Sequence, residues 1–221
     1  MTTWGDVKEE FRDGFRDVTA DYISDDELLR MLRRVLRLID NPGGYTFQQQ
    51  ETTIALSGVN SYDLDTYTPG WRRILSVTNS LGQTDGIPLE LGYVDMKDLQ
   101  VTIDRYVYSI FQNRYLRFYS PNTSPLTGSI KLIWFSRYLC KDATTNEFKA
   151  LPEVDDDYFA IPEDWMDVVT EGLLWLGFRK DRSNREDASE AKTAFENRKM
   201  ELITTETIQV ASPSRNMSGA F

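Results

Sequence analysis

The chain has 221 residues, of which 35 are acidic and 25 basic, so its formal net charge is −10. An acidic balance of this size argues against a protein that grips nucleic acid by neutralising phosphates. Histidine is absent and Cys140 is the single cysteine, which excludes a histidine-based triad, histidine–cysteine metal clusters and an internal disulfide.

The composition favours a folded protein. Hydrophobic residues make up 40% of the chain and aromatic residues 12%, enough for one substantial core or two small ones. No apolar run approaches the length of a membrane span. The N-terminus lacks the basic and apolar regions of a signal peptide. We therefore expect a protein of the cytoplasm in which it is made, with no membrane partner.

The first forty residues predict two helices. Thr3 is placed to cap a short helix whose apolar side chains, from Trp4 to Phe15, share one face. The run Ser24–Glu27 has the pattern of a capping box and begins a second helix. This helix extends to Ile39, and the sequence Asn41-Pro42-Gly43-Gly44 ends it.

The second helix carries arginines opposite its apolar stripe. They are Arg30, Arg33, Arg34 and Arg37. One interpretation is nucleic-acid binding. Acidic residues flank the arginines, however, which favours a solvated face or an ion-pairing contact with a neighbouring subunit.

Residues 45–154 read as a β-rich region. Short strand candidates are separated by turn-rich segments, which is typical of a small antiparallel sandwich or barrel. Residues 115–119 and 129–138 predict an antiparallel pair joined by a loop that contains two prolines. A short helix is expected over residues 96–105.

Residues 155–203 predict two further helices. Pro162 fits the first turn of a helix that runs to Lys180, and a weaker apolar stripe continues from Ala188 to Leu202. Residues 204–221 have little apolar content and are expected to form an extended arm. Four spaced apolar residues of this arm, Ile208, Val210, Met217 and Phe221, are candidates for ordering on a partner.

The order of these segments defines the expected fold class, α+β. Residues 1–44 and 155–203 would form a helical core. Residues 45–154 would be a β sandwich or barrel-like insertion in that core, and residues 204–221 the C-terminal arm.

Motifs for catalysis are absent from the sequence. There is no glycine-rich phosphate loop and no nucleophile elbow. The densest carboxylate group, Glu153 to Asp164, could serve a glycosidase or a calcium site, but a solvated linker is the favoured interpretation. We predict no catalytic residue, no metal ligand and no cofactor.

Aromatic residues of the β-rich region, among them Tyr119 and Trp134, offer another possibility. They could form a sugar-binding face or a platform for single strands. Most alternate with polar residues along strand candidates, which favours core positions.

The layout resembles the head-to-tail connector, or adaptor, proteins of tailed bacteriophages, such as the tail tubular gatekeeper of short-tailed phages. The resemblance is carried by the opening helix Ser24–Ile39, by Tyr62 and Leu64, and by the return segment Phe159–Trp165 with its IPEDW sequence. It covers almost the whole chain as a pattern of elements.

The resemblance implies a structural virion protein at the head–tail junction, with no enzymatic activity. Its relatives assemble as dodecameric rings under the portal protein and extend a DNA channel through which the genome passes without specific binding. The C-terminal arm would dock on the portal, and the opposite face would receive the next tail, nozzle or stopper ring protein. The ring core would be built by helices carrying Leu28, Met31, Val35, Trp165, Val169, Leu173 and Leu176. The alternative is a non-enzymatic tail module that binds carbohydrate or a receptor.

Overall fold

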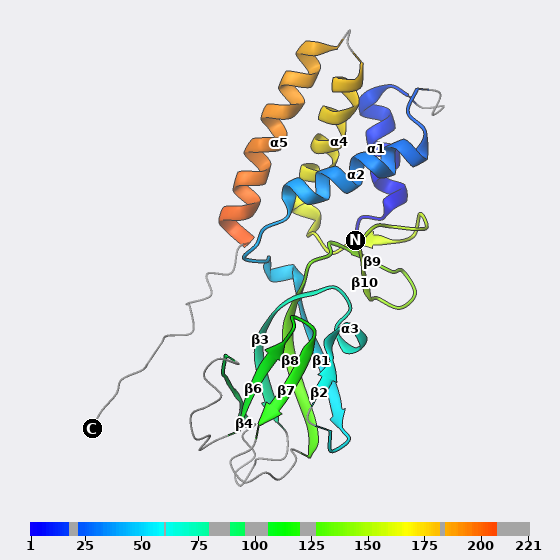
Figure 1. Cartoon of the computed structure of the whole chain (residues 1–221). Coiled ribbons are helices and arrows are strands. Elements are labelled where there is room, and N and C mark those ends of the chain that lie inside the picture. The colour runs from blue at the N-terminus through cyan, green and yellow to red at the C-terminus, as the bar shows by residue number, and fades with distance from the viewer. Residues whose placement is uncertain are drawn as a thin grey trace, which may run out of the picture. The chain divides into compact units, whose positions relative to one another are not determined.

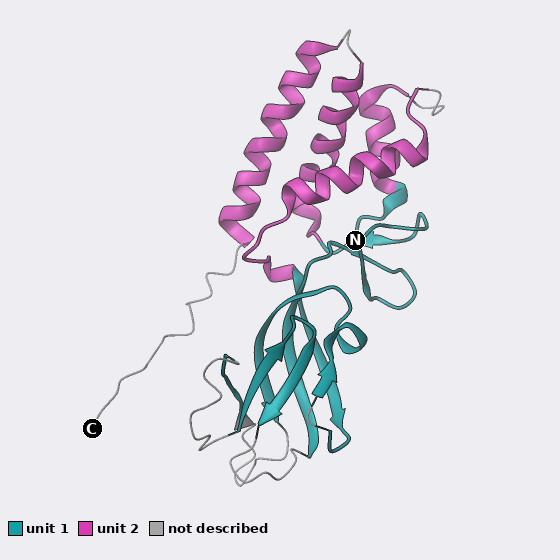
Figure 2. Cartoon of the chain, viewed as in Figure 1, with its two compact units in different colours: residues 1–5, 48–160 teal, residues 6–47, 161–221 magenta. Residues whose placement is uncertain are grey.

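Two compact units make up the chain in the computed structural model, which describes residues 1–17, 22–59, 61–79, 89–95, 106–119, 127–181 and 184–206. Residues 1–5 and 48–160 form a β-rich unit, and residues 6–47 and 161–221 form a helical unit (Figure 2). The predicted α+β class is confirmed. The helix expected over residues 96–105 lies outside the described residues.

The β-rich unit contains two four-stranded sheets (Figure 1). In order, the first holds β1 (Gln49–Leu56), β8 (Gly128–Ser136), β3 (Trp71–Asn79) and β4 (Leu89–Glu90). The second holds β2 (Ser61–Asp63), β7 (Tyr115–Tyr119), β6 (Val107–Phe111) and β5 (Gly92–Tyr93). Neighbouring strands are antiparallel except β5 and β6, which are parallel. A short helix, α3 (Leu64–Tyr67), follows β2.

One hydrophobic cluster joins the two sheets. It includes Ile74 and Trp134 from the first sheet and Leu116 and Phe118 from the second. The shared cluster fits the sandwich-like arrangement that the spacing of the short strand candidates predicted. The predicted pairing of residues 115–119 with 129–138 is wrong, because β7 and β8 lie in different sheets. The connection between them is longer than a tight hairpin turn, so it does not fix which strand becomes the neighbour.

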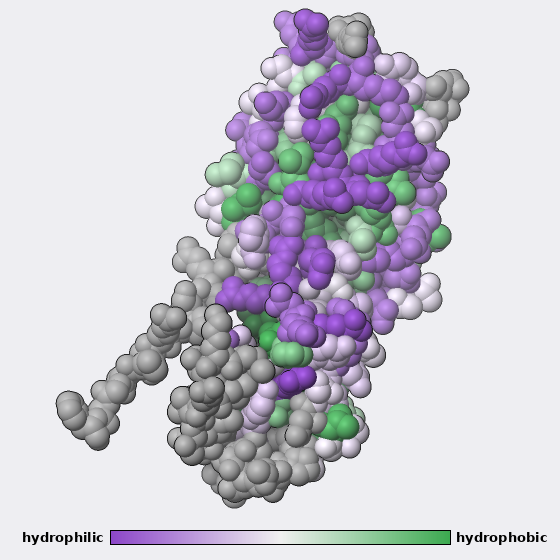
Figure 3. All heavy atoms as spheres, in the orientation of Figure 1, coloured by the Kyte–Doolittle hydropathy of each residue, from purple (hydrophilic) through white to green (hydrophobic). Residues whose placement is uncertain are grey.

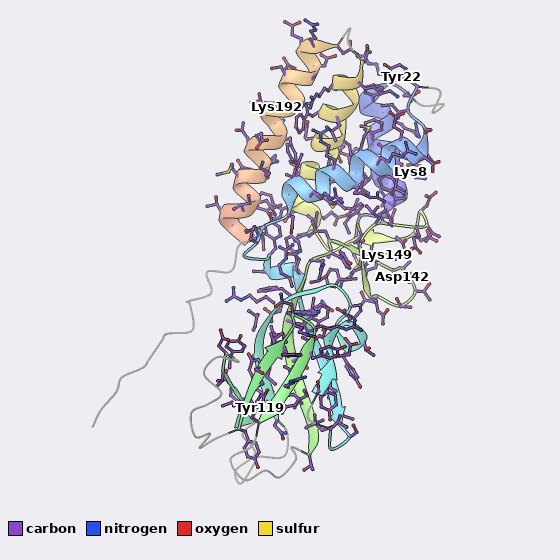
Figure 4. The ribbon with its side chains drawn as sticks, in the orientation of Figure 1. Lys8, Tyr22, Tyr119, Asp142, Lys149 and Lys192 are labelled. Carbon is purple, nitrogen blue, oxygen red and sulfur yellow. The ribbon has the colours of Figure 1, made fainter. Side chains whose placement is uncertain are left out.

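A small third sheet organises the rest of this unit. Its strands, in order, are β10 (Phe148–Lys149), β9 (Cys140–Lys141) and β11 (Tyr158–Phe159). Next to it lies Asp157, whose carboxylate is fully buried. The carboxylate accepts hydrogen bonds from the backbone N–H groups of Glu153 at 2.6 Å and Val154 at 3.1 Å, and from the Lys149 ammonium at 2.9 Å. Figure 4 shows Lys149 beside Asp142, which lies 3.0 Å from the same ammonium.

The N-terminal residues are joined to this cluster by the backbone. The N–H of Trp4 donates to the carbonyl oxygen of Asp157 at 2.7 Å, and the N–H of Gly5 donates to that of Asp155 at 2.9 Å. Thr3 forms a β-bridge with Tyr158. A buried carboxylate thus orders the loop that receives the start of the chain.

The helical unit is built from four α-helices. They are α1 (Trp4–Phe15), whose first two residues belong to the β-rich unit, α2 (Asp25–Ile39), α4 (Asp167–Lys180) and α5 (Arg185–Glu206). Two short 3₁₀ helices, η1 (Thr46–Gln48) and η3 (Glu163–Trp165), precede β1 and α4. Ser24 caps α2 by accepting the N–H of Glu27 at 3.3 Å. The Glu27 carboxylate binds Lys180 of α4 at 2.7 Å.

Helix α4 packs closely on its neighbours, and small residues make this possible. A Cβ atom added to Gly172 would lie 2.7 Å from Cγ1 of Val35 on α2 and 3.1 Å from Cδ2 of Phe195 on α5. At Gly177 it would lie 3.1 Å from Phe11 and Phe15 of α1. Each glycine therefore marks a place where α4 contacts another helix at short range.

Two boundaries differ from those predicted from the sequence. Pro162 precedes the 3₁₀ turn η3, and α4 itself begins at Asp167, so Trp165 lies before α4. Helix α5 continues through residues 204–206, which were predicted to belong to the arm. Its end is held by packing and hydrogen bonds that local composition does not reveal.

Candidate assembly surfaces

The residues predicted for the ring core lie in the helical unit. Leu28, Val35, Val169, Leu173 and Leu176 are buried, and Met31 and Trp165 are partly exposed. The buried side chains stabilise a single subunit by removing apolar area from water. Contacts to another molecule would therefore use residues other than these buried ones.

The end of α5 is fixed by a carboxylate. Glu206 accepts a hydrogen bond from Nε1 of Trp165 at 3.3 Å and another from the hydroxyl of Thr46. These bonds tie the last described residue to η3 and η1. The four candidate anchors of the arm, Ile208, Val210, Met217 and Phe221, lie outside the described residues.

The solvent-facing side of α2 is strongly basic. Arg30, Arg33, Arg34 and Arg37 are all exposed, opposite the buried stripe of Leu28, Leu32, Val35 and Ile39. Hydrophilic residues cover the region that α2 crosses (Figure 3). Cationic side chains gather on this face although the whole chain is acidic.

A groove of about 470 Å³ lies between α2 and α4. Arg30 and Arg34 line it from α2, and Arg179 and Lys180 from α4. Within the part of the chain that the structure describes, Lys180 pairs with Glu27, whereas the three arginines enter no ion pair. We call this concave surface the arginine groove. Three unpaired guanidinium groups attract an anionic group in solvent.

The carboxylates of residues 153–164 do not converge on one point. Asp157 is neutralised by Lys149, and the described residues contain no group of His, Cys, Asp or Glu arranged to hold a metal ion. Burial alone would raise the pKa of Asp157, but its hydrogen bonds from backbone N–H groups and from Lys149 lower that pKa below its ordinary value. This carboxylate therefore stabilises a loop.

Of the two aromatic residues singled out in the β-rich unit, Trp134 is buried and Tyr119 is partly exposed. Trp134 is 5% exposed and donates from Nε1 to the hydroxyl of Thr52 at 3.0 Å. Burial, with Tyr93 and Glu90 nearby, raises the pKa of Tyr108 to about 12. Because Trp134 is a core residue, it does not belong to an exposed sugar-binding face.

Comparison with known families identifies the chain. The family model for the SU10 adaptor protein matches residues 2–218. The chain belongs to the SU10 adaptor protein family. This match confirms the resemblance to phage head–tail adaptor proteins and supports a structural role in the virion. A search of curated proteins found no match.

The structure of this family member adds what the sequence pattern did not show. The arginines of α2 were visible in the sequence, but Arg179 and Lys180 were not expected to join them. Their meeting depends on how α4 packs on α2.

No helix in the described ranges is both long enough and apolar enough to cross a membrane.

Proposed function

We propose that this member of the family assembles as a dodecameric ring under the portal protein, where it joins the capsid to the tail and extends the DNA channel. The observation that carries the proposal is the family match, which spans nearly the whole chain. The portal and the next tail, nozzle or stopper ring protein are its proposed partners at the head–tail junction. The role is structural and involves no reaction.

The net charge of −10 suits a channel protein of this kind. An acidic surface repels the phosphate backbone, so DNA passes without binding to the wall. The helical unit would supply the body of the ring. The arm beyond Glu206 would dock on the portal through its apolar residues, ordering as it binds.

A truncation tests the role of the arm. The proper cut follows Glu206, because Thr204–Glu206 belong to α5 and Glu206 is bonded to Trp165 and Thr46. A chain of residues 1–206 keeps every described contact of the helical unit. We expect it to remain folded but not to join purified portal rings, whereas the full chain forms a complex of stoichiometric mass with them in light scattering.

A matched full-length variant separates the loss of anchors from the loss of length. It carries serine at Ile208, Val210, Met217 and Phe221, and should also fail to bind the portal. Co-sedimentation of the truncated chain with portal rings would refute docking through the arm. Failure of the full chain to join the portal under any condition would refute the adaptor proposal itself.

A further inference from the structure

Helix α1 displays acidic residues at the same spacing as the arginines of α2. Asp6, Glu9, Glu10 and Asp13 are all exposed. They occupy positions i, i+3, i+4 and i+7, as do Arg30, Arg33, Arg34 and Arg37. At 3.6 residues per turn, such a set falls within an arc of about 100° and extends about 10 Å along the helix. We call the two sets the acid stripe and the arginine stripe.

Both cations of α1, Lys8 and Arg12, form ion pairs with a residue of α2. Lys8 lies 3.4 Å from Asp25 of α2, and Arg12 lies 2.5 Å from the same residue. Arg12 also contacts the buried carboxylate of Asp17 at 3.6 Å. Lys8 and Arg12 of α1 are therefore both paired with Asp25 of α2, and the acid stripe lies on the exposed face of α1.

The acid stripe acts on groups nearby. Burial, together with the charges of Asp167 and Glu10, raises the pKa of Glu171 on α4. In the described part of the chain, Glu9 and Asp13 enter no ion pair, and neither do Arg30 and Arg34. One subunit therefore displays a pair of acidic side chains and a pair of basic side chains, each at positions i and i+4, that enter no ion pair among the described residues.

We propose that the acid stripe of one copy of this chain docks on the arginine stripe and arginine groove of the next copy. Two different faces of one subunit then form a heterologous, head-to-tail contact, which closes into a ring when the rotation per subunit permits. The groove of about 470 Å³ gives the contact a concave side that receives a helix face. The inference rests on the proposed ring and names the surfaces that form it.

The contact is ionic and partly solvated, so it depends on salt. Exposed ion pairs are individually weak, but several pairs in register determine specificity and orientation. Raising the salt concentration from about 0.05 M to about 0.5 M shortens the screening length severalfold and should weaken self-association. An interface made only of apolar contacts would not respond in this direction.

Two charge-reversal variants test the contact. R30E/R34E leaves the arginine stripe with two acidic and two basic residues, and E9R/D13R does the same to the acid stripe, so each variant keeps one charged stripe and makes the other neutral. All four positions are exposed on helices, and Glu and Arg have similar helix propensities, so both proteins should fold. A matched control for R30E/R34E, R185E/K192E, makes the same change in net charge on exposed positions of α5, where Figure 4 labels Lys192.

Each stripe variant alone should self-associate at least about tenfold more weakly than the natural chain, with and without portal rings present. The control should assemble like the natural chain. An equimolar mixture of the two variants should associate, because the intact acid stripe of R30E/R34E complements the intact arginine stripe of E9R/D13R. Sedimentation velocity and native mass spectrometry distinguish a complex that contains both proteins from either protein alone.

The outcomes separate this inference from the proposed function. No association in the mixture, or normal assembly of R30E/R34E alone, overturns the interface and leaves the adaptor role standing. Association of the mixture while the natural chain never joins the portal supports the interface and overturns the adaptor role. If R30E/R34E assembles normally but loses binding to a duplex DNA probe, the arginine groove serves nucleic acid and the interface is again overturned.

Discussion

Replacing Gly172 with alanine should destabilise the helical unit. The added Cβ would lie 2.7 Å from Cγ1 and 3.0 Å from Cγ2 of Val35, and 3.1 Å from Cδ2 of Phe195. Val35 and Phe195 are both fully buried. A β-branched side chain in a packed core has few alternative rotamers, so the helices themselves must shift.

The magnitude follows from two opposing effects. Overpacking a core costs roughly 1–3 kcal/mol. Replacing glycine with alanine in a helix raises the free energy of unfolding by about 0.5–1 kcal/mol, because the unfolded chain loses backbone freedom. Because the closest contact is only 2.7 Å and Val35 is buried, the upper part of the first range, about 2–3 kcal/mol, applies, and we expect G172A to lower the free energy of unfolding by about 1–2.5 kcal/mol. Urea titration followed by far-ultraviolet circular dichroism measures it, since the helices dominate that signal.

Two further variants make the test specific. G14A changes a glycine whose added Cβ would meet the end of the flexible Leu174 side chain at 3.0 Å. Because that side chain can move, G14A should change stability by less than about 0.5 kcal/mol or increase it. V35A removes the methyl groups that oppose Gly172, so G172A/V35A should be more stable than the sum of the single changes by about 1 kcal/mol. A G172A protein as stable as the natural chain, or strict additivity in the double variant, would refute the reasoning.

Three other predictions concern single contacts. Asp157→Asn should destabilise the β-rich unit by about 2–4 kcal/mol, because it leaves the Lys149 ammonium without its buried partner. Folding lowers the pKa of Asp157, so its ionised carboxylate stabilises the natural protein above the unfolded pKa near 4, and this stabilisation is lost as the pH falls through the folded pKa. Urea titrations at several pH values should show this pH dependence in the natural protein and not in the variant. Ser24→Ala removes the cap that accepts the Glu27 N–H and should cost about 1 kcal/mol, whereas Ser24→Asp should not; equal losses in both variants would contradict a capping role. Cys140 is buried and burial raises its pKa, so iodoacetamide should label it only after unfolding, and rapid labelling of the native protein, measured by mass spectrometry, would contradict its placement.

Local signals in the sequence predicted much of the helical unit. Ser24 and Glu27 occupy the N-cap and N3 positions of α2, and the Pro-Gly-Gly run after Asn41 follows its end. Such signals act through hydrogen bonds and backbone preferences of residues a few positions apart, which is why one sequence suffices to find them. The α+β class and the resemblance to phage adaptors followed from the order of these elements.

Sequence reasoning failed where contacts join distant residues. The neighbours of β7 and β8 were mispredicted because strand pairing depends on which apolar faces share the core, and a long connection imposes no partner. Trp134 was a candidate for a surface role until its burial between the sheets assigned it to the core.

The sequence by itself determined where the helices lie, the acidic balance and the arginines of α2. Only the tertiary structure decided what those charges do. Packing of α1 on α2 commits Lys8 and Arg12 to Asp25, and packing of α4 brings Arg179 to the groove. Whether a charged side chain forms an ion pair depends on which residues lie near it in space. Those distances are set by the tertiary fold and cannot be obtained from the spacing of residues along the chain.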